Sequence, residues 1–178
     1  ILMDIYSFSA ITNPMVHNNT LPLSLPGLNH VQALCRCLGK ILVPGSILML
    51  EGDLGSGKTT LVQSMGAGLG ITDVMASPTF ALIHEYPEGR IPLYHFDLYR
   101  LDPPEVNALH LETYWEGMEV NLGIVAVEWP DRLLDWPENH LHCHLTYVDE
   151  GREITLTPYG QIDWDSICNH LQLFGLLH

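Results

Sequence analysis

Apolar residues follow two different spacings along this chain, and the two spacings predict different elements. Over residues 28–41 apolar side chains recur three and four positions apart, which predicts an amphipathic helix. Residues 46–51 and 124–127 are nearly unbroken apolar runs, typical of parallel strands that are buried on both faces. A second helix is predicted over residues 59–69, where Gly70 ends it. This alternation of helices and buried strands indicates an α/β fold.

The remaining segments predict a mixed sheet and a single domain. No internal repeat or linker separates the segments of residues 21–178, so we expect them to form one domain. Residues 1–20 are rich in Ser, Thr and Asn and have no periodic pattern, which predicts a disordered extension. The further predicted elements are strands at 80–86 and 91–98, a helical stretch at 103–115, a C-terminal antiparallel hairpin of 140–147 with 153–157, and a helix at 163–174.

The charge of the chain limits what it can bind. The net charge is −14, with only seven lysines and arginines in the whole sequence. Binding to a nucleic-acid backbone needs clustered cations, so we expect no direct contact with nucleic acid unless a partner supplies them. No apolar run reaches the roughly 18 residues of a membrane helix. The first basic residue is Arg36, so neither a secretory signal nor a transit peptide is expected, and the sequence predicts a cytoplasmic protein.

Cysteine and histidine residues give weaker signals. The four cysteines form no CxxC pair and are expected to be reduced residues of the core. His140, His142 and His144 alternate along a predicted strand, which places three imidazoles on one face. A solvated strand face is the simpler interpretation of this row, and a metal site is the alternative.

The segment between the first buried strand and the second helix carries the most specific signal. It matches the P-loop pattern G-x-x-x-x-G-K-[ST] through Gly52, Asp53, Leu54, Gly55, Ser56, Gly57, Lys58 and Thr59. Glycines let consecutive N–H groups turn toward a phosphate, and the helix that follows adds its positive N-terminal end. Lys58 is placed to reach the β- and γ-phosphates, the Thr59 hydroxyl to ligate Mg²⁺, and Thr60 to touch the α-phosphate. The sequence therefore predicts a P-loop NTPase-like, three-layer domain that binds ATP with Mg²⁺.

Two carboxylates at the ends of apolar runs are candidates for the chemistry of hydrolysis. Hydrolysis needs an acid near the metal and a group that orients the attacking nucleophile. Glu128 follows the run at residues 124–127, and Asp97 follows the run at residues 93–96. The alternative for both is a solvated strand terminus. Asp53, inside the loop, is expected to brace the loop backbone rather than to contact metal.

Three segments beyond the loop narrow the class of protein. They are Ser77-Pro78-Thr79-Phe80, His95-Phe96-Asp97-Leu98-Tyr99-Arg100-Leu101 and Glu128-Trp129-Pro130. Together with the loop, and over about residues 21–159, this arrangement resembles the TsaE (YjeE) family, bacterial P-loop ATPases of tRNA threonylcarbamoyladenosine biosynthesis. The loop alone would fit many families, whereas the three further segments would not.

The resemblance implies which residues hold the ligands. Lys58, Thr59 and Thr60 would hold the phosphates and Mg²⁺, and Glu128 would be a second magnesium ligand, direct or through water. The implied partners are TsaB and TsaD, the complex that modifies adenosine next to the anticodon. On this view the chain meets tRNA only indirectly.

The resemblance also implies catalytic roles. Asp97 would be the residue most needed for hydrolysis, together with Lys58 and Glu128. Thr79 would lie in a segment that senses the γ-phosphate, and Trp129 would line the site.

Other function classes stay open at this point. A small-molecule or nucleotide kinase would use the same loop, but only four arginines lie beyond it and no Arg-rich lid segment is present. A GTPase is disfavoured because the sequence has no Asn-Lys-x-Asp segment to read guanine. A nucleotide-dependent interaction module that does not hydrolyse would need the same Lys58 and Thr59.

Overall fold

The structure, a computed structural model, describes residues 20–148 and 151–177. The predicted disordered extension, residues 1–20, lies outside these ranges apart from Thr20, and it stays a prediction, as does a single domain over residues 21–178. Within the described residues, no helix has the length and apolar character that crossing a membrane requires. The elements are β1 (Leu21–Leu25), α1 (Leu28–Ile41), β2 (Ile47–Gly52), α2 (Lys58–Leu69), β3 (Ile83–Tyr86), β4 (Leu93–Asp97), α3 (Pro103–Asn107), α4 (Glu112–Glu116), β5 (Ile124–Glu128), the 3₁₀ turn η1 (Pro130–Arg132), β6 (His140–Val148), β7 (Gly151–Tyr159) and α5 (Trp164–Leu173).

The strands of the described residues form one mixed sheet. Its order is β1-β7-β6-β2-β5-β4-β3, with seven strands. Strand β2 lies at the centre, parallel to β5 on one side and to β6 on the other, and β4 is parallel to β5. The pairs β3–β4, β6–β7 and β1–β7 are antiparallel. The predicted parallel core strands and C-terminal hairpin are therefore confirmed.

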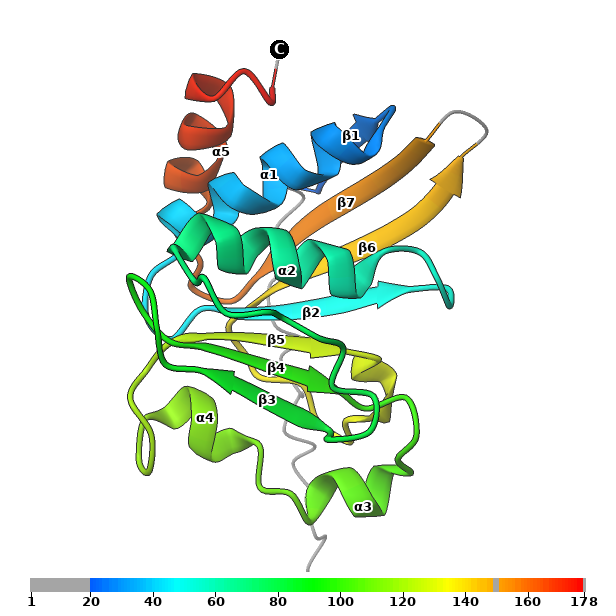
Figure 1. Cartoon of the computed structure of the whole chain (residues 1–178), viewed down its shortest axis with the longest axis vertical. Helices are drawn as coiled ribbons and strands as arrows, with labels where there is room; N and C mark the ends of the chain where they lie inside the picture. The colour runs from blue at the N-terminus through cyan, green and yellow to red at the C-terminus, as the bar shows by residue number, and fades with distance from the viewer. Residues whose placement is uncertain (1–19, 149–150, 178) are drawn as a thin grey trace, which may run out of the picture.

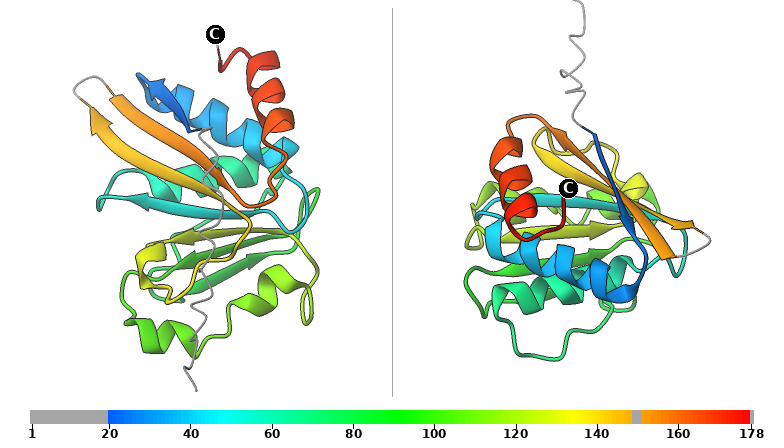
Figure 2. Two further views of the ribbon diagram at one scale, coloured as in Figure 1. Left: turned by 180° about the vertical axis from the view of Figure 1, so that it is seen from behind. Right: turned by 90° about the horizontal axis from the view of Figure 1, so that it is seen from above.

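Helices cover both faces of the sheet. Helices α1, α2 and α5 lie on one face, and α3 and α4 lie against the β3–β4–β5 half of the other (Figures 1 and 2). Leu48 and Leu50 of β2 pack in the core under α1 and α2, whereas Ile47 and Met49 pack in the core next to α3 and α4. Successive residues of a strand point to opposite faces, so burial on both faces requires the unbroken apolar run of β2. The three-layer fold is confirmed.

Helices α1 and α2 form where the sequence predicted them. Helix α1 buries the apolar stripe that includes Val31, Leu34 and Leu38, and α2 ends where Gly70 takes a left-handed conformation, with φ of 85°. Cys35, Cys37 and Cys143 are buried free thiols, in agreement with the expected core role, whereas Cys168 is only partly buried. Burial raises the pKa of the Cys35 thiol well above its ordinary value, so this thiol stays protonated.

The helical stretch predicted over residues 103–115 is wrong as one element. It forms two short helices, α3 and α4, because His110 between them has φ of 51°. A left-handed residue cannot continue a right-handed helix. Asp102 begins α3 through a reciprocal capping arrangement with Glu105.

Two strand predictions also differ from the structure. Strand β3 begins at Ile83 rather than at residue 80, because the Leu82 N–H bonds back to the Pro78 carbonyl in a turn and Leu82 has φ of 68°. Strand β1 was not predicted. Only Leu23 and Leu25 of its five residues are buried, so its apolar signal is short.

The parallel strands bring three chemically important positions to one edge of the sheet. Gly52, Asp97 and Glu128 are the last residues of β2, β4 and β5. In the register of the sheet Asp97 lies beside Glu128, and Leu50 lies beside Glu128 on its other side. Because the carboxyl ends of parallel strands meet at one edge, residues far apart in the sequence converge there.

Close contact between α1 and α2 predicts an unusual response to a glycine substitution. A Cβ on Gly39 would lie 2.2 Å from the Met65 carbonyl oxygen, so Gly39→Ala must push the helices apart. We expect destabilisation of about 1–3 kcal/mol in urea unfolding, although alanine ordinarily stabilises a helix interior. Gly27→Ala is the control, because Gly27 is extended and its nearest contact would be at 3.8 Å. Equal stability of the two variants would contradict this helix contact.

Candidate functional site

The loop between β2 and α2 takes a conformation that requires glycine. Gly52, Gly55 and Gly57 have φ of 148°, 80° and 111°, all in the region that L side chains rarely adopt. At Gly52 space is limiting as well, because a Cβ would lie 2.5 Å from the Leu145 carbonyl oxygen. The Ser56 N–H donates to the Asp53 carbonyl and closes a turn within the loop. Backbone geometry thus explains the glycine spacing seen in the sequence.

Lys58 folds back over this loop rather than pointing to solvent. Its Nζ donates to the carbonyl oxygens of Gly52 at 2.7 Å and Asp53 at 3.1 Å, and it lies 4.1 Å from the centre of the Trp129 ring. Only 4% of the residue is exposed. Burial lowers the pKa of the Lys58 ammonium from its ordinary value, and nearby carboxylates, Glu128 first, act in the opposite direction. The Asp53 carbonyl oxygen thus accepts from both Lys58 and the Ser56 N–H, and the bracing role of Asp53 stays a prediction.

Thr59 and Glu128 meet directly below the loop. The Thr59 hydroxyl donates to Glu128 Oε1 at 2.8 Å, and Glu128 is buried at the end of β5. His95, fully buried on β4, donates from Nε2 to the same oxygen at 2.8 Å. Two donors therefore fix one oxygen of the Glu128 carboxylate. Hydroxyl and carboxylate oxygens in this arrangement are ligands suited to a hard cation such as Mg²⁺.

Asp97 anchors the segment that precedes β3. Its Oδ2 accepts a hydrogen bond from the Thr79 hydroxyl at 2.6 Å and a longer one from Ser77 at 3.5 Å. Its Oδ1 accepts the Tyr99 backbone N–H at 3.1 Å. The Asp97 carboxylate, 4% exposed, thus ties two segments to the end of β4. Phe80, next to Thr79, is 85% exposed and has the Arg100 guanidinium 4.2 Å from its ring centre.

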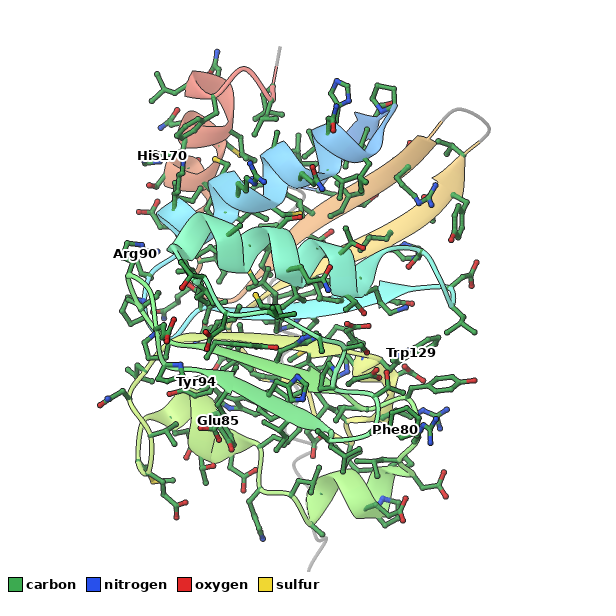
Figure 3. All side chains as sticks on the ribbon, viewed as in Figure 1. Phe80, Glu85, Arg90, Tyr94, Trp129 and His170 are labelled. Carbon is green, nitrogen blue, oxygen red and sulfur yellow. The ribbon has the colours of Figure 1, made fainter. Side chains whose placement is uncertain are left out.

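These groups surround a cavity of about 340 Å³ at the carboxyl edge of the sheet. Trp129 and Tyr99 form one wall, with their ring centres 4.9 Å apart. Trp129 itself has φ of 61°, which turns the chain sharply after β5. Figure 3 shows Trp129 and Phe80 at this end of the sheet. The lining residues are Leu54, Gly55, Gly57, Lys58, Thr59, Thr60, Ser77, Thr79, Asp97, Tyr99, Glu128 and Trp129.

A second cavity, of about 250 Å³, adjoins the first. Gly55, Gly57 and Thr60 line both, so the loop forms the boundary between them. The rest of the second cavity is formed mainly by the chain around β1 and the start of α1, with Leu25, Gly27, Leu28, Val31, Ser56, Gly151 and Arg152. The first cavity is therefore rich in polar groups, and the second is largely apolar.

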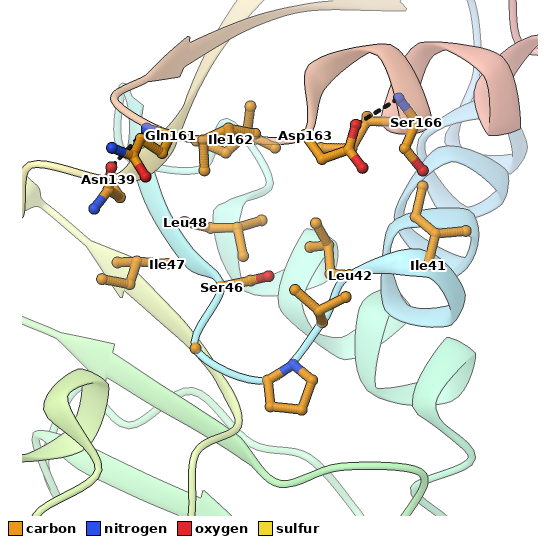
Figure 4. Close-up of a pocket in the computed structure, with 15 residues that line it drawn as sticks. Ile41, Leu42, Ser46, Ile47, Leu48, Asn139, Gln161, Ile162, Asp163 and Ser166 are labelled. Carbon is orange, nitrogen blue, oxygen red and sulfur yellow. Dashed lines mark hydrogen bonds between the residues drawn. The ribbon is translucent and has the colours of Figure 1, made fainter.

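A third cavity lies at the opposite edge of the sheet, between the start of β2 and α5 (Figure 4). Its volume is about 190 Å³. The polar groups drawn there bond to one another: the Gln161 N–H donates to Asn139 Oδ1, and the Ser166 N–H donates to Asp163 Oδ1. Strand β2 spans about 20 Å between this cavity and the loop, so the two do not form one site.

The structure brings every predicted site residue to one place. Residues of the loop, Thr60, Thr79, Asp97, Glu128 and Trp129 all lie at the carboxyl edge of β2, β4 and β5. The roles of His95 and Ser77 were missed, although His95 is a polar residue within an apolar run. Tyr99 was missed too, because no pattern in the sequence indicates stacking on Trp129.

The histidine row does not form a metal site. Within residues 20–148 and 151–177, no group of three or more His, Cys, Asp or Glu side chains could hold a metal ion. His140 is buried and stacked on Tyr159, with ring centres 4.6 Å apart, and His142 bonds to Glu51 at 2.8 Å. Burial lowers the pKa of His140, which favours its neutral form. The expected solvated face is wrong for His140, which is buried, whereas His142 and His144 are partly exposed.

Fold and site together define a class: α/β proteins with a glycine-rich loop between a buried parallel strand and a helix, and with acidic residues on the neighbouring strands. Residues 25–154 match the family described as threonylcarbamoyl adenosine biosynthesis protein TsaE. The chain belongs to the TsaE family. The resemblance seen in the sequence is thereby confirmed, and so is a role in tRNA threonylcarbamoyladenosine biosynthesis.

Individual relatives agree with this assignment. A Nostoc protein named tRNA threonylcarbamoyladenosine biosynthesis protein TsaE is 58% identical over 124 residues, which cover 69% of this chain and 76% of the relative. The Bacillus subtilis protein of the same name is 38% identical over 142 residues, 79% of this chain and 86% of that one. The crystal structure of YdiB from Bacillus subtilis superposes with a TM-score of 0.69 at 32% identity, covering 92% of this chain and 99% of that one.

Removal of the Asp97 carboxylate should release the segments that it ties. In Asp97→Ala the Tyr99 N–H loses its acceptor, so we expect its amide to exchange about 5- to 10-fold faster, with faster exchange over residues 77–82. Hydrogen exchange followed by mass spectrometry or NMR measures this. Asp102→Ala is the control, and its effect should be confined to α3, which Asp102 caps. Unchanged protection of Tyr99 in Asp97→Ala would contradict the anchoring role.

Proposed function

We propose that this chain binds ATP with Mg²⁺ at the carboxyl edge of the sheet and hydrolyses it in support of tRNA threonylcarbamoyladenosine formation. The observation that carries this proposal is the contact between the Thr59 hydroxyl and the Glu128 carboxylate, 2.8 Å long, directly below the glycine-rich loop. It joins the loop to an acidic residue from a strand 69 positions away in sequence. A loop that only turned the chain would not need a buried carboxylate there.

The phosphate chain fits the loop and the first turn of α2. Backbone N–H groups of a glycine-rich loop and the N-terminal end of a helix together favour an anion. Lys58 supplies the cation, and its ammonium would exchange the Gly52 and Asp53 carbonyls for phosphate oxygens. Bound Mg²⁺ would neutralise charge that develops on the phosphates, and Thr59 and Glu128 are the residues that fit it.

The nucleoside end fits the second cavity. Because Gly55, Gly57 and Thr60 line both cavities, a ligand held by the loop through its phosphates can extend past Thr60 into the neighbouring space. Apolar side chains such as Leu25 and Val31 favour a flat, uncharged base there. This arrangement supports a nucleotide rather than inorganic phosphate as the ligand.

Asp97 is the residue that we assign to hydrolysis. It faces the cavity beside Glu128, and it holds the Thr79 hydroxyl, so it can orient a water molecule or place Thr79 near the terminal phosphate. Lys58 is the cation among the residues that line this cavity. Stabilisation of the transition-state charge by an arginine would have to come from elsewhere, so we expect slow turnover by the chain alone.

We propose that partner proteins supply the cationic surface for tRNA that this chain lacks. With a net charge of −14 and seven lysines and arginines, it cannot form an extended cationic surface for tRNA. We propose that a TsaB–TsaD complex contacts the tRNA and that this chain acts on that complex in the cytoplasm. Nucleotide hydrolysis here would then be coupled to the modification step through protein contacts.

Replacement of Lys58 tests whether the glycine-rich loop binds the phosphates of ATP. Lys58→Ala should weaken ATP binding about 10- to 150-fold, because one buried charge-assisted contact contributes about 1.5–3 kcal/mol. Isothermal titration calorimetry with MgATP measures the affinity. Lys40→Ala is a matched control, since Lys40 lies at the end of α1 with its Nζ 5.6 Å from the Phe174 ring centre. Native affinity in Lys58→Ala would reject the loop as the phosphate site.

Reconstitution with TsaB, TsaD and tRNA tests the function. We expect the chain to associate with the pair in a nucleotide-dependent way and ATP turnover to rise on association. Asp97→Ala should keep its ATP affinity and lose the stimulated turnover, as followed by phosphate release and by the amount of modified adenosine. Unchanged turnover in Asp97→Ala would reject its catalytic role. Association without any turnover by the wild-type chain would instead support a non-hydrolysing interaction module.

A further inference from the structure

Two side chains of the C-terminal hairpin hold the glycine-rich loop from outside. The Tyr147 hydroxyl, at the end of β6, donates to the Gly55 carbonyl oxygen. Arg152, at the start of β7, donates from Nε to the Ser56 carbonyl oxygen at 3.1 Å. The Arg152 guanidinium also lies over the Tyr147 ring, 3.9 Å from its centre. Hairpin and loop are more than 90 residues apart in sequence, at separations of 92 and 96.

These contacts fix the direction in which backbone N–H groups of the glycine-rich loop point. A trans peptide group is planar, and its C=O and N–H point in opposite directions. A side chain that fixes the Ser56 carbonyl therefore also fixes the direction of the Gly57 N–H, which points away from Arg152. In the same way, the contact to the Gly55 carbonyl fixes the peptide that joins Gly55 to Ser56.

The loop needs such support because glycine gives it little of its own. Gly55 and Gly57 have φ of 80° and 111°, and glycine populates many other conformations as readily. A phosphate chain binds more tightly to N–H groups that are already arranged, because ordering them on binding would oppose the association. Contacts to two consecutive carbonyls from the paired strands β6 and β7 supply this arrangement before the ligand arrives.

We propose that Arg152 and Tyr147 are positioning residues for the glycine-rich loop, holding its backbone in the conformation that binds a triphosphate. This inference rests on the proposed function, since it concerns the same ligand. The C-terminal hairpin is then part of the nucleotide site, although Arg152 and Tyr147 act through the loop backbone rather than on the reacting atoms. Arg152 also lines the second cavity, on the boundary that the loop forms.

Two variants distinguish a positioning role of these side chains from an effect of their charge on the ligand. Tyr147→Phe removes one hydroxyl and leaves the ring and the net charge unchanged. Arg152→Gln removes the guanidinium and its charge. For inorganic triphosphate and for MgATP, we expect the dissociation constant to rise about 3- to 10-fold in Tyr147→Phe and at least as much in Arg152→Gln. In Tyr147→Phe, turnover at saturating ATP with TsaB and TsaD should stay within about 2-fold of wild type, because Tyr147 lines neither cavity and does not act on the reacting atoms.

Matched controls and a readout without ligand complete the test. Tyr159→Phe, at the far end of β7, and Arg36→Gln, on the exposed face of α1, should bind triphosphate as the wild type does. Amide exchange over residues 53–57 of the free chain should be faster in Tyr147→Phe and Arg152→Gln, while the melting temperature without ligand stays within about 2 °C of wild type. A role confined to stability would lower the melting temperature and leave the affinity of the folded chain unchanged, which would overturn the inference.

The outcomes also distinguish this inference from the proposed function. If the wild-type chain does not bind MgATP, the proposed function fails and the inference fails with it. If the wild type binds MgATP and Lys58→Ala binds it more weakly, while Tyr147→Phe and Arg152→Gln bind triphosphate like the wild type, only the inference is overturned.

Discussion

The parallel pairing of β2, β5 and β4 is the constraint on which the site depends. Parallel strands end at the same edge of a sheet, so Gly52, Glu128 and Asp97 reach one place from three distant parts of the chain. The register is equally important, because it sets Asp97 beside Glu128. A slip by one residue would turn both carboxylates to the other face of the sheet, away from α2. The same register places Ile124 and Ala126 in one core and Val125 and Val127 in the other, which links the packing of the sheet to the geometry of the site.

The buried polar groups at this edge form two hydrogen-bonded sets rather than isolated charges. One set joins Thr59, Glu128 and His95, and the other joins Asp97 with Thr79 and Tyr99. A buried carboxylate is tolerated when donors surround it, and each of these has at least two. The cost of this arrangement is visible at His95, whose Nδ1 is buried without a hydrogen-bond partner among the described residues. A buried polar atom without a partner is unfavourable, and such atoms are expected at functional sites.

The sequence predicted the parts of this protein that local patterns determine. Apolar spacing predicted α1, β2 and β5 because helices and buried strands impose different periods. The loop pattern predicted its own glycines, and Gly70 indicated the end of α2. Asp97 and Glu128 were found because they end apolar runs. The break at His110 could not be predicted, since it depends on one backbone angle. The contacts of Tyr147 and Arg152 with the loop could not be predicted either, because they join residues 92 and 96 positions apart and no local pattern indicates them.

The position of Lys58 has a consequence for the energetics of ligand binding. When the chain folds, two backbone carbonyls and the face of Trp129 replace water around the Lys58 ammonium. An exposed lysine must shed its hydration shell when an anion arrives, and that dehydration offsets much of the attraction. Here the dehydration belongs to folding, so an incoming phosphate oxygen replaces a carbonyl oxygen and little bound water is released from the cation. The dehydration that remains on binding is therefore mainly that of the phosphate, because the cation has already exchanged part of its water for carbonyl oxygens.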